Sequence, residues 1–218
     1  MSAQLVADRS RTLEEFKQLV ESSETKYEYI DGEVWEWEMM AGATPPHSKI
    51  CANATTTLSQ CFRRASRRCT ALTADTYISI PGEPTYRFPD VPVVCNDIEY
   101  DPEFELAITN PVALIEVISE SSKDADRGSK FKRYSQIPSL RLYILIEQDY
   151  PQCHVHARDD GSSPWQTTVY FQLGSEVYLP HLDIAFPLSD LYDDLVWKSS
   201  GVAVVPGAGR PTYERRRG

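Results

Sequence analysis

Two carboxylates lie in apolar segments that are expected to be buried in the core, away from water. Glu116 lies in the segment VALIEVIS, in which nearly every neighbour is apolar, and Asp90 opens the apolar segment DVPVVC. A buried carboxylate is paired, protonated or bound to a metal, because an isolated charge in a core is very costly. Two such groups on neighbouring strands offer the hard oxygen ligands that suit Mg²⁺ or Mn²⁺. The alternatives are a structural ion pair at Glu116 and a turn or strand-end cap at Asp90.

The segment that follows Glu116 supplies cations that phosphate chemistry could use. It reads SESSKDADRGSKFKRYSQ, in which Arg127, Lys130 and Tyr134 are spaced i, i+3 and i+7 and therefore share one face of a helix. A cation beside the two carboxylates could orient an attacking water or stabilise charge that develops on a phosphate. The alternative for Lys130 is a solvated lysine on an exposed helix.

A histidine pair offers a second, weaker metal candidate. His154 and His156 are two residues apart, so on a strand they would share a face. No third ligand is evident nearby in the sequence, and a surface strand is the preferred interpretation.

The apolar pattern predicts the elements that must position these residues. Helices are expected at about residues 12–24, 47–66 and 124–136, with Pro45 and Pro46 opening the second of them. A hairpin is expected around Asp31 and Gly32, and strands at about 72–80, 90–95, 112–119 and 141–148. The segments HVHAR, TTVYFQL and EVYLPHLDIAF read as antiparallel edge strands. The central order of helix, three strands, helix and strand predicts an α/β fold with a mixed sheet flanked by helices.

Length and composition fit one soluble domain. The chain has 218 residues, of which 41% are hydrophobic and 25% charged. We expect a single domain over residues 1–197 with its core at about 45–147, and a loose Gly/Pro-rich tail over 198–218. No apolar run is long enough to span a membrane, and the N-terminus lacks the pattern of a secretory signal, so a cytoplasmic location is expected.

Cysteine spacing and net charge further limit the range of possible functions. The five cysteines form no C-x-x-C pair, so neither a disulfide framework nor a cysteine zinc site is expected. The net charge of -10 argues against broad attraction to a phosphate backbone, although a local basic groove or bound metal could compensate. The one basic cluster expected in the folded body comprises Arg63, Arg64, Arg67 and Arg68, which suit either a helix C-terminus or a phosphate contact.

At these residues the sequence resembles the Uma-type restriction-endonuclease-like proteins, a branch of the PD-(D/E)XK nuclease superfamily. The matching stretches are YEYIDGEVWEWE, PPHSKI, FPDVPVVC and NPVALIEVISESSKDADRGSKFKRYSQIPSLRLYILIEQ. Together they fall within roughly residues 25–195, and the spacing from the PD dipeptide to the glutamate strand and then to the R-G-x-K-x-x-x-Y helix is fairly specific.

The resemblance implies a restriction-endonuclease-like fold and metal-dependent cleavage of phosphodiester bonds. Asp90 matches the PD aspartate and Glu116 the D/E position, and with the backbone carbonyl of Val117 they would bind Mg²⁺ or Mn²⁺. The lysine that usually follows is replaced by Ile118, and Lys130 from the next helix would take its place.

Further residues acquire roles from the same resemblance. Glu28 would act as an additional acid, with Glu33 as a weaker candidate, while an exposed hairpin glutamate is the alternative. His47 would contact substrate phosphate or assist proton transfer, or would only form a hydrogen bond at the helix start. Arg127 and Tyr134 would contact the substrate.

The implied substrate is nucleic acid, with DNA favoured over RNA, and a homodimer would provide two active sites for two strands. The rival hypothesis is a degenerate module of the same fold, which binds nucleic acid or protein and has an ion pair in place of the metal. The sequence lacks G-x-S-x-G, H-E-x-x-H, P-loop and Rossmann glycine patterns, which disfavours hydrolases of other kinds.

Overall fold

The computed structural model describes residues 4–36, 44–82, 84–118, 126–197 and 203–205. A six-stranded mixed sheet lies at its centre, in the order β12-β11-β10-β9-β7-β4. Its two innermost strands, β9 (Ala113–Ile118) and β10 (Leu142–Glu147), are buried at every position and run parallel. Their near-continuous apolar sequences suit strands covered on both faces. The outer strands are β7 (Val91–Cys95), β4 (Cys69–Ala71), β11 (Cys153–Ala157) and β12 (Gln166–Tyr170).

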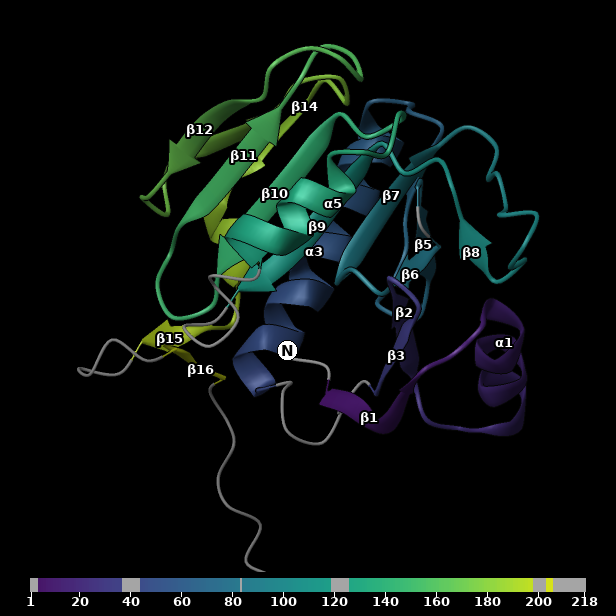
Figure 1. The fold of residues 1–218 in the computed structure, drawn as a ribbon. Coiled ribbons are helices and arrows are strands. Elements are labelled where there is room, and N and C mark those ends of the chain that lie inside the picture. The colour runs from purple at the N-terminus through teal and green to yellow at the C-terminus, as the bar shows by residue number, and fades with distance from the viewer. Residues whose placement is uncertain (1–3, 37–43, 83, 119–125, 198–202, 206–218) are drawn as a thin grey trace, which may run out of the picture.

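Helices cover both faces of this sheet (Figure 1). Helix α3 (Pro45–Arg64) begins at its N-cap Thr44, whose side chain accepts a hydrogen bond from the backbone N–H of His47. Its apolar face packs on one side of the sheet with the following core residues: Ile50, Ala54, Leu58, Val91, Ile115 and Val117. The helix predicted at residues 47–66 is confirmed as α3, and the predicted mixed sheet is confirmed as well.

The other face of the sheet is covered by the crossover that joins β9 to β10. It contains a π-helical turn, η1 (Asp126–Lys130), followed directly by helix α5 (Phe131–Tyr134). Tyr134 and Ile137 pack there against Leu114, Ile118 and Tyr143. The crossover makes β9 and β10 parallel, as the sequence predicted. Residues 119–125, where the predicted helix begins, lie outside the described residues.

A second sheet, in the order β1-β3-β2-β6-β5-β8, joins the N-terminal region to the middle of the chain. Its strands are β1 (Gln4–Ser10), β2 (Tyr27–Ile30), β3 (Glu33–Glu36), β5 (Tyr77–Ile80), β6 (Thr85–Arg87) and β8 (Ala107–Ile108). Phe16 of helix α1 (Leu13–Ser22) lies in an aromatic cluster on this sheet. The hairpin predicted at Asp31 and Gly32 is confirmed between β2 and β3, and both turn residues have positive φ.

The single strand predicted at residues 72–80 is wrong. Residues 69–71 form β4 in the central sheet, whereas residues 77–80 form β5 in the second sheet. A turn separates them, in which the N–H of Thr76 donates to the carbonyl of Thr73 at 3.1 Å. Local turn chemistry in the segment TADT therefore divides a run that looks continuous by composition.

The C-terminal strands build outward from the central sheet. Strands β11 and β12 extend it antiparallel, as predicted. Strands β13 (Glu176–Leu179) and β14 (Ile184–Pro187) form a separate hairpin, followed by the 3-10 helix η2 (Leu188–Tyr192). Short strands β15 (Val196–Trp197) and β16 (Ala203–Val204) pair with each other, so the expected tail contributes one strand, and the domain limits stay a prediction. Among the described residues no helix is both long and apolar enough to cross a membrane.

A disulfide joins Cys69 and Cys95, contrary to the expectation from cysteine spacing. The two residues are separated by 26 positions in the sequence but lie directly opposite each other in the antiparallel pair β4 and β7. No short motif marks such a pair, because only the register of the two strands brings the thiols together. Cys51, Cys61 and Cys153 are free.

A buried arginine ties α5 to the central sheet. Arg158 is 5% exposed and its guanidinium donates to the carbonyls of Leu140 (2.8 Å), Ile137 (2.6 Å), Ser135 (2.9 Å) and Gly161 (3.0 Å). Its plane also lies 4.5 Å from the centre of the Trp165 ring. These bonds fix the chain directly after α5, and with it the position of Lys130 and Tyr134.

We predict that Arg158→Ala lowers the free energy of unfolding by about 2–4 kcal/mol, because several buried carbonyls lose their donor. Arg158→Lys should recover little, since an ammonium cannot reproduce the planar fork of donors. Urea unfolding followed by circular dichroism measures both. Arg68→Ala is the control, because that side chain is 77% exposed and its loss should change stability by about 0.5 kcal/mol at most. Equal effects at residues 158 and 68 would contradict the assignment.

Candidate active site

Asp90 and Glu116 lie on neighbouring antiparallel segments of the central sheet. Val91 pairs with Ile115 in the register of β7 and β9, so Asp90, which directly precedes β7, lies beside Glu116 in the sequence of pairs. Their exposed fractions are 4% for Asp90 and 2% for Glu116. Both acids are therefore buried near the start of β7, and the charge of Asp90 acts on Glu116.

The carboxylate of Asp90 is held by a backbone N–H of β9 and by a side chain of α3. Its Oδ2 accepts the backbone N–H of Val117 at 2.7 Å and lies 3.2 Å from Nε2 of His47. Burial opposes ionisation of Asp90, but the contact with His47, the charge of Lys130 and the Val117 N–H outweigh it and keep the pKa of this carboxyl below its usual range. Asp90 is thus an ionised acid with a fixed orientation.

Glu116 is held by the crossover segment on the opposite side from α3. Its Oε2 lies 3.1 Å from the ammonium of Lys130, and its Oε1 accepts the hydroxyl hydrogen of Tyr134 at 3.1 Å. Burial, together with the charges of Asp90 and Asp126, raises the pKa of Glu116 to about 8 despite the opposing effect of Lys130. Glu116 thus ionises only near neutral to alkaline pH unless a further cation arrives.

Lys130 is buried, not solvated. It is 4% exposed and its Nζ also contacts Oδ1 of Asp126 at 2.6 Å. Burial disfavours the charged amine, but Glu116 and Asp126 outweigh that cost and raise the pKa of Lys130 above its ordinary value. Ile118, at the position of the usual motif lysine, lies in the apolar core. The structure therefore brings a cation from the next helix to Glu116, as the resemblance implied.

Glu28 is buried and paired, not an exposed hairpin residue. It has no exposed surface, its Oε1 accepts the N–H of Phe88 at 3.0 Å, and its Oε2 lies 2.9 Å from Arg87. Glu28 and Arg87 both act electrostatically on Lys130. The structure thus places Glu28 next to the cluster through Arg87, and its chemical role stays a prediction. Glu33 lies on β3 at the turn of the hairpin.

The remaining predicted residues separate into two groups. Tyr134 lies with Lys130 at Glu116, whereas Arg127 forms an ion pair with Glu147 and lies 3.2 Å from Nε2 of His154. His156 contacts the hydroxyl of Thr167 at 2.8 Å on the neighbouring strand. Arg127 is therefore directed toward the end of β10, and the two histidines lie in an ordinary strand environment.

Part of the basic cluster at the end of α3 is engaged in ion pairs. Arg67 lies 2.9 Å from Asp183, and Arg68 lies 3.5 Å from Asp97. Arg63 and Arg64 lie in the last turn of α3, where cations suit the helix C-terminus.

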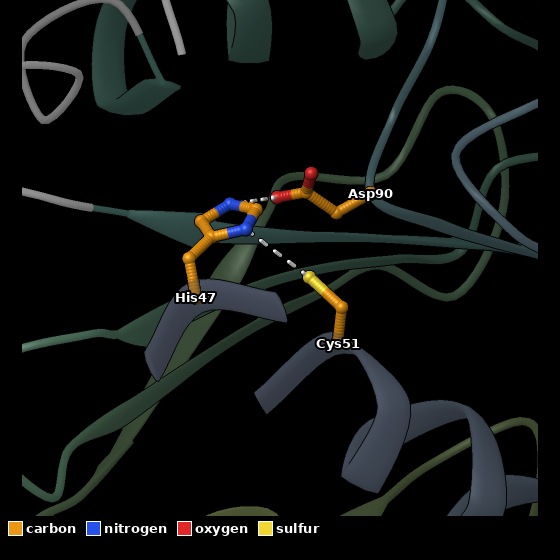
Figure 2. Close-up of side chains that lie close together, drawn as sticks. All are labelled: His47, Cys51 and Asp90. Carbon is orange, nitrogen blue, oxygen red and sulfur yellow. Dashed lines mark hydrogen bonds and ion pairs between the residues drawn. The ribbon is translucent and has the colours of Figure 1, made fainter. Parts of the chain in front are cut away.

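Two residues beside the buried acids, Asp126 and Cys51, were not predicted from the sequence. Asp126 precedes Lys130 by four positions and Cys51 follows His47 by four, a spacing that places both pairs on a shared helical face. Cys51 Sγ lies 3.6 Å from Nδ1 of His47, which in turn contacts Asp90 (Figure 2). Burial and the charges of Asp90 and Glu116 raise the pKa of the Cys51 thiol, so it stays protonated and is no nucleophile.

The site carries more buried negative charge than its cations neutralise. Four acids, Asp90, Glu116, Asp126 and Glu28, are each at most 4% exposed. The permanent cations among them are Lys130 and Arg87. Excess carboxylate in a core is relieved by protonation or by a bound cation, and oxygen ligands suit Mg²⁺ or Mn²⁺. The residues present therefore fit a divalent metal.

Comparison with known proteins agrees with this geometry. A crystal structure described as "a putative nuclease" from Anabaena variabilis has a TM-score of 0.63 and 20% identity, covering 83% of this chain and 96% of that one. Two uncharacterized proteins of Synechocystis sp. are similar in sequence. One, slr1290, is 30% identical over 84% of this chain and 92% of its own length, and the other, sll1609, is 28% identical over 79% and 94%. The family model Uma2, described as "Putative restriction endonuclease", matches residues 13–189.

The mixed sheet with helices on both faces forms a restriction-endonuclease-like core. Within the class of proteins with this core, the chain belongs to the Uma2 family of restriction-endonuclease type.

We predict that the metal-free protein loses stability as the pH rises from about 5 to about 8. The folded protein keeps the Glu116 proton up to about pH 8, whereas an unfolded glutamate loses it near 4.5. The folded state binds more protons in this window, so the free energy of unfolding falls, by at most about 1.4 kcal/mol per pH unit. Glu116→Gln should remove this slope.

The measurement is urea unfolding between pH 5 and 8.5 with a metal chelator present. Glu14→Gln is the matched control, because the Glu14 side chain is 71% exposed on α1 and its variant should follow the parent. A parent and a Glu116→Gln variant with parallel pH profiles would show that Glu116 does not hold the proton.

Proposed function

We propose that this chain is a metal-dependent endonuclease that hydrolyses phosphodiester bonds, with Asp90 and Glu116 as metal ligands. The observation that supports it most is the pair of neighbouring, buried carboxylates with the ammonium of Lys130 at 3.1 Å from one of them. An acid pair alone could serve a structural role. The same pair with more negative charge around it than the lysine neutralises favours a site for a divalent cation.

Each residue of the cluster has a task in this proposal. Asp90 and Glu116, with the backbone carbonyl of Val117, would hold Mg²⁺ or Mn²⁺, which when bound lowers the pKa of a water and stabilises charge on the phosphate. The Val117 N–H and His47 fix the orientation of Asp90. Lys130 places a positive charge where the phosphate would gain negative charge, and Tyr134 orients Glu116 by its hydroxyl.

Burial sets a requirement on substrate access. Asp90, Glu116 and Lys130 are each at most 4% exposed, so a phosphodiester can reach them only if the protein opens at this end of the sheet. The proposal includes that opening, which binding of metal and nucleic acid would favour over the closed state.

Finer features of the proposal follow from the family description and from symmetry. We propose DNA rather than RNA as the substrate, because the family is described as one of restriction endonucleases. A homodimer would bring two sites to the two strands of a duplex. The cytoplasmic location expected from the sequence stays a prediction.

We predict that Asp90→Asn and Glu116→Gln each reduce Mg²⁺-dependent cleavage of plasmid DNA by at least about 100-fold, because each removes a charged metal ligand. Lys130→Met should reduce the rate by about 10- to 1000-fold through loss of charge stabilisation. Gel assays with Mg²⁺ or Mn²⁺ measure the rates. Asp97→Asn is the matched control, since Asp97 lies beyond the other end of β7 with its side chain 96% exposed, and it should cleave like the parent.

Cleavage at the parental rate by the variants of Asp90 and Glu116 would refute the proposed site. Circular dichroism must show that the variants are folded, because both acids are buried and their loss can affect stability as well as chemistry.

The second candidate is a degenerate module that binds nucleic acid or protein without cleaving it. One observation favours it: both oxygens of Glu116 are already engaged, by Lys130 and by Tyr134. An ion pair could thus stand permanently where a metal would bind.

Calorimetry with Mn²⁺ separates the two candidates. For a nuclease we expect saturable binding that Asp90→Asn weakens by at least about 10-fold, because a ligand with full negative charge is replaced by a neutral amide. Binding should also tighten as the pH rises toward about 8, since Glu116 must lose its proton. Heats that are equal in the parent and in both carboxylate variants would favour the degenerate module.

A further inference from the structure

Asp90 has a second set of neighbours that differs in chemistry from the first. His47 and Cys51 lie one turn apart on α3 and both point toward Asp90 (Figure 2). One ligand atom from each of the three residues lies within 4.8 Å of the other two. Among the described residues this is the one group of three acidic, histidine or cysteine side chains that is close enough to hold a metal. Glu116 is not part of it.

The donor set of this cluster is one nitrogen, one sulfur and one oxygen. Thiolate and imidazole ligands select Zn²⁺ and related transition metals, whereas Mg²⁺ prefers oxygen alone. Three protein ligands would leave one position of a tetrahedral ion for water or substrate. The sequence contains no C-x-x-C motif, but a zinc site needs only that the fold bring suitable donors together.

The two short distances within the cluster use different ring nitrogens of His47. Ligand atoms around tetrahedral Zn²⁺ lie about 3.3–3.6 Å apart, given metal–ligand distances of ~2.0–2.3 Å. His47 Nε2 and Asp90 Oδ2 are 3.2 Å apart, and His47 Nδ1 and Cys51 Sγ are 3.6 Å apart. An ion takes one ring nitrogen, so the imidazole must turn or the thiol must shift by roughly 1 Å to complete the site.

The surroundings of this cluster favour a bound cation, although the cluster lies near the N-terminus of α3. The first turn of α3 carries a partial positive charge, which disfavours a cation. The carboxylate of Asp90 acts on the Cys51 thiol, however, and its full charge exceeds the partial charge of a helix end. The backbone under the site is firmly fixed, because Ile50 and Ala54 next to Cys51 are in the core.

We propose that His47, Cys51 and Asp90 form a binding site for a thiophilic divalent cation of the Zn²⁺ type, and that this ion competes with the proposed magnesium ion for Asp90. Binding would release the thiol proton to solvent and hold Asp90 on the side of α3, where it already lies 3.2 Å from His47. The existence of the zinc-type site follows from the geometry alone, whereas the competition rests on the proposed function. Zn²⁺ would thus inhibit the nuclease by withdrawing a ligand.

Co²⁺ is the probe for the site, because a thiolate ligand gives Co²⁺ a charge-transfer absorption that oxygen ligands do not. The full-length, metal-free protein is titrated with Co²⁺ in a buffer without thiol reductants, and Zn²⁺ is then added. We expect the absorption to saturate at one ion per chain and to vanish on addition of Zn²⁺. It should be lost in Cys51→Ser and reduced in His47→Gln.

Cys61→Ser is the matched control, because Cys61 is also a free, buried cysteine on α3 and should leave the absorption unchanged. Absence of the absorption in the parent protein overturns the proposal, and so does its persistence in Cys51→Ser. The parent protein alone can overturn the proposal by lacking the absorption. The test is therefore decisive even if a variant folds poorly.

A second titration tests the competition and separates it from the proposed function. Mn²⁺ affinity is measured by calorimetry with and without one equivalent of Zn²⁺. In the parent we expect Zn²⁺ to weaken Mn²⁺ binding by at least about 10-fold, and in Cys51→Ser by less than about 2-fold. Equal weakening in both proteins, or none in the parent, overturns the competition.

The Glu116→Gln variant distinguishes failure of the zinc-type site from failure of the proposed function. It should abolish Mn²⁺ binding while it leaves the Co²⁺ absorption intact, because Glu116 is a ligand of the first ion only. A parent that gives the Co²⁺ absorption but binds no Mn²⁺ would refute the proposed function and keep the zinc-type site. A parent that binds Mn²⁺ without giving that absorption would do the reverse.

Discussion

Burial of more carboxylate than the surrounding cations neutralise is the interaction on which the site depends. A core lowers the dielectric around Asp90, Glu116 and Asp126, so their mutual repulsion is strong and the proton on Glu116 is held up to about pH 8. A protein that needed only stability could have placed apolar residues there at little cost. The retention of charge against that cost points to a function that uses it, and a divalent cation is the simplest group that restores neutrality.

The fold supplies this arrangement through three elements that contact Asp90 or Glu116. The antiparallel register with β9 sets Asp90 beside Glu116, the crossover brings Lys130 and Tyr134 to one face, and the start of α3 brings His47 to the other. No two of these three elements are sufficient to position the whole site. Packing of α3 and α5 on the two faces of a doubly buried sheet therefore positions the chemistry as well as stabilising the domain.

Much of this could be predicted from the sequence, and the remainder has physical reasons. The buried strands, the crossover and the acids at positions 90 and 116 follow from apolar periodicity and from charges that interrupt it. Asp126 and Arg87 could not be assigned, because a charged residue in a polar segment looks solvated until tertiary contacts bury it. The bond between Cys69 and Cys95 depends on strand register, and Cys51 depends on which face of α3 turns inward. The division of residues 72–80 between two sheets came from a local turn.

Asp90 is common to the two proposed metal sites, and its neighbours differ on the two sides. On the side of β9 it accepts the N–H of Val117, and the proposed hard cation would be shared there with Glu116; on the side of α3 it meets the nitrogen and sulfur of His47 and Cys51, which select softer cations. His47 contacts Asp90 through Nε2 and Cys51 through Nδ1. Because an ion bound on either side must share Asp90, the two sets cannot be filled independently. In this proposal, the identity of the bound metal determines whether Asp90 shares an ion with Glu116 or with His47 and Cys51.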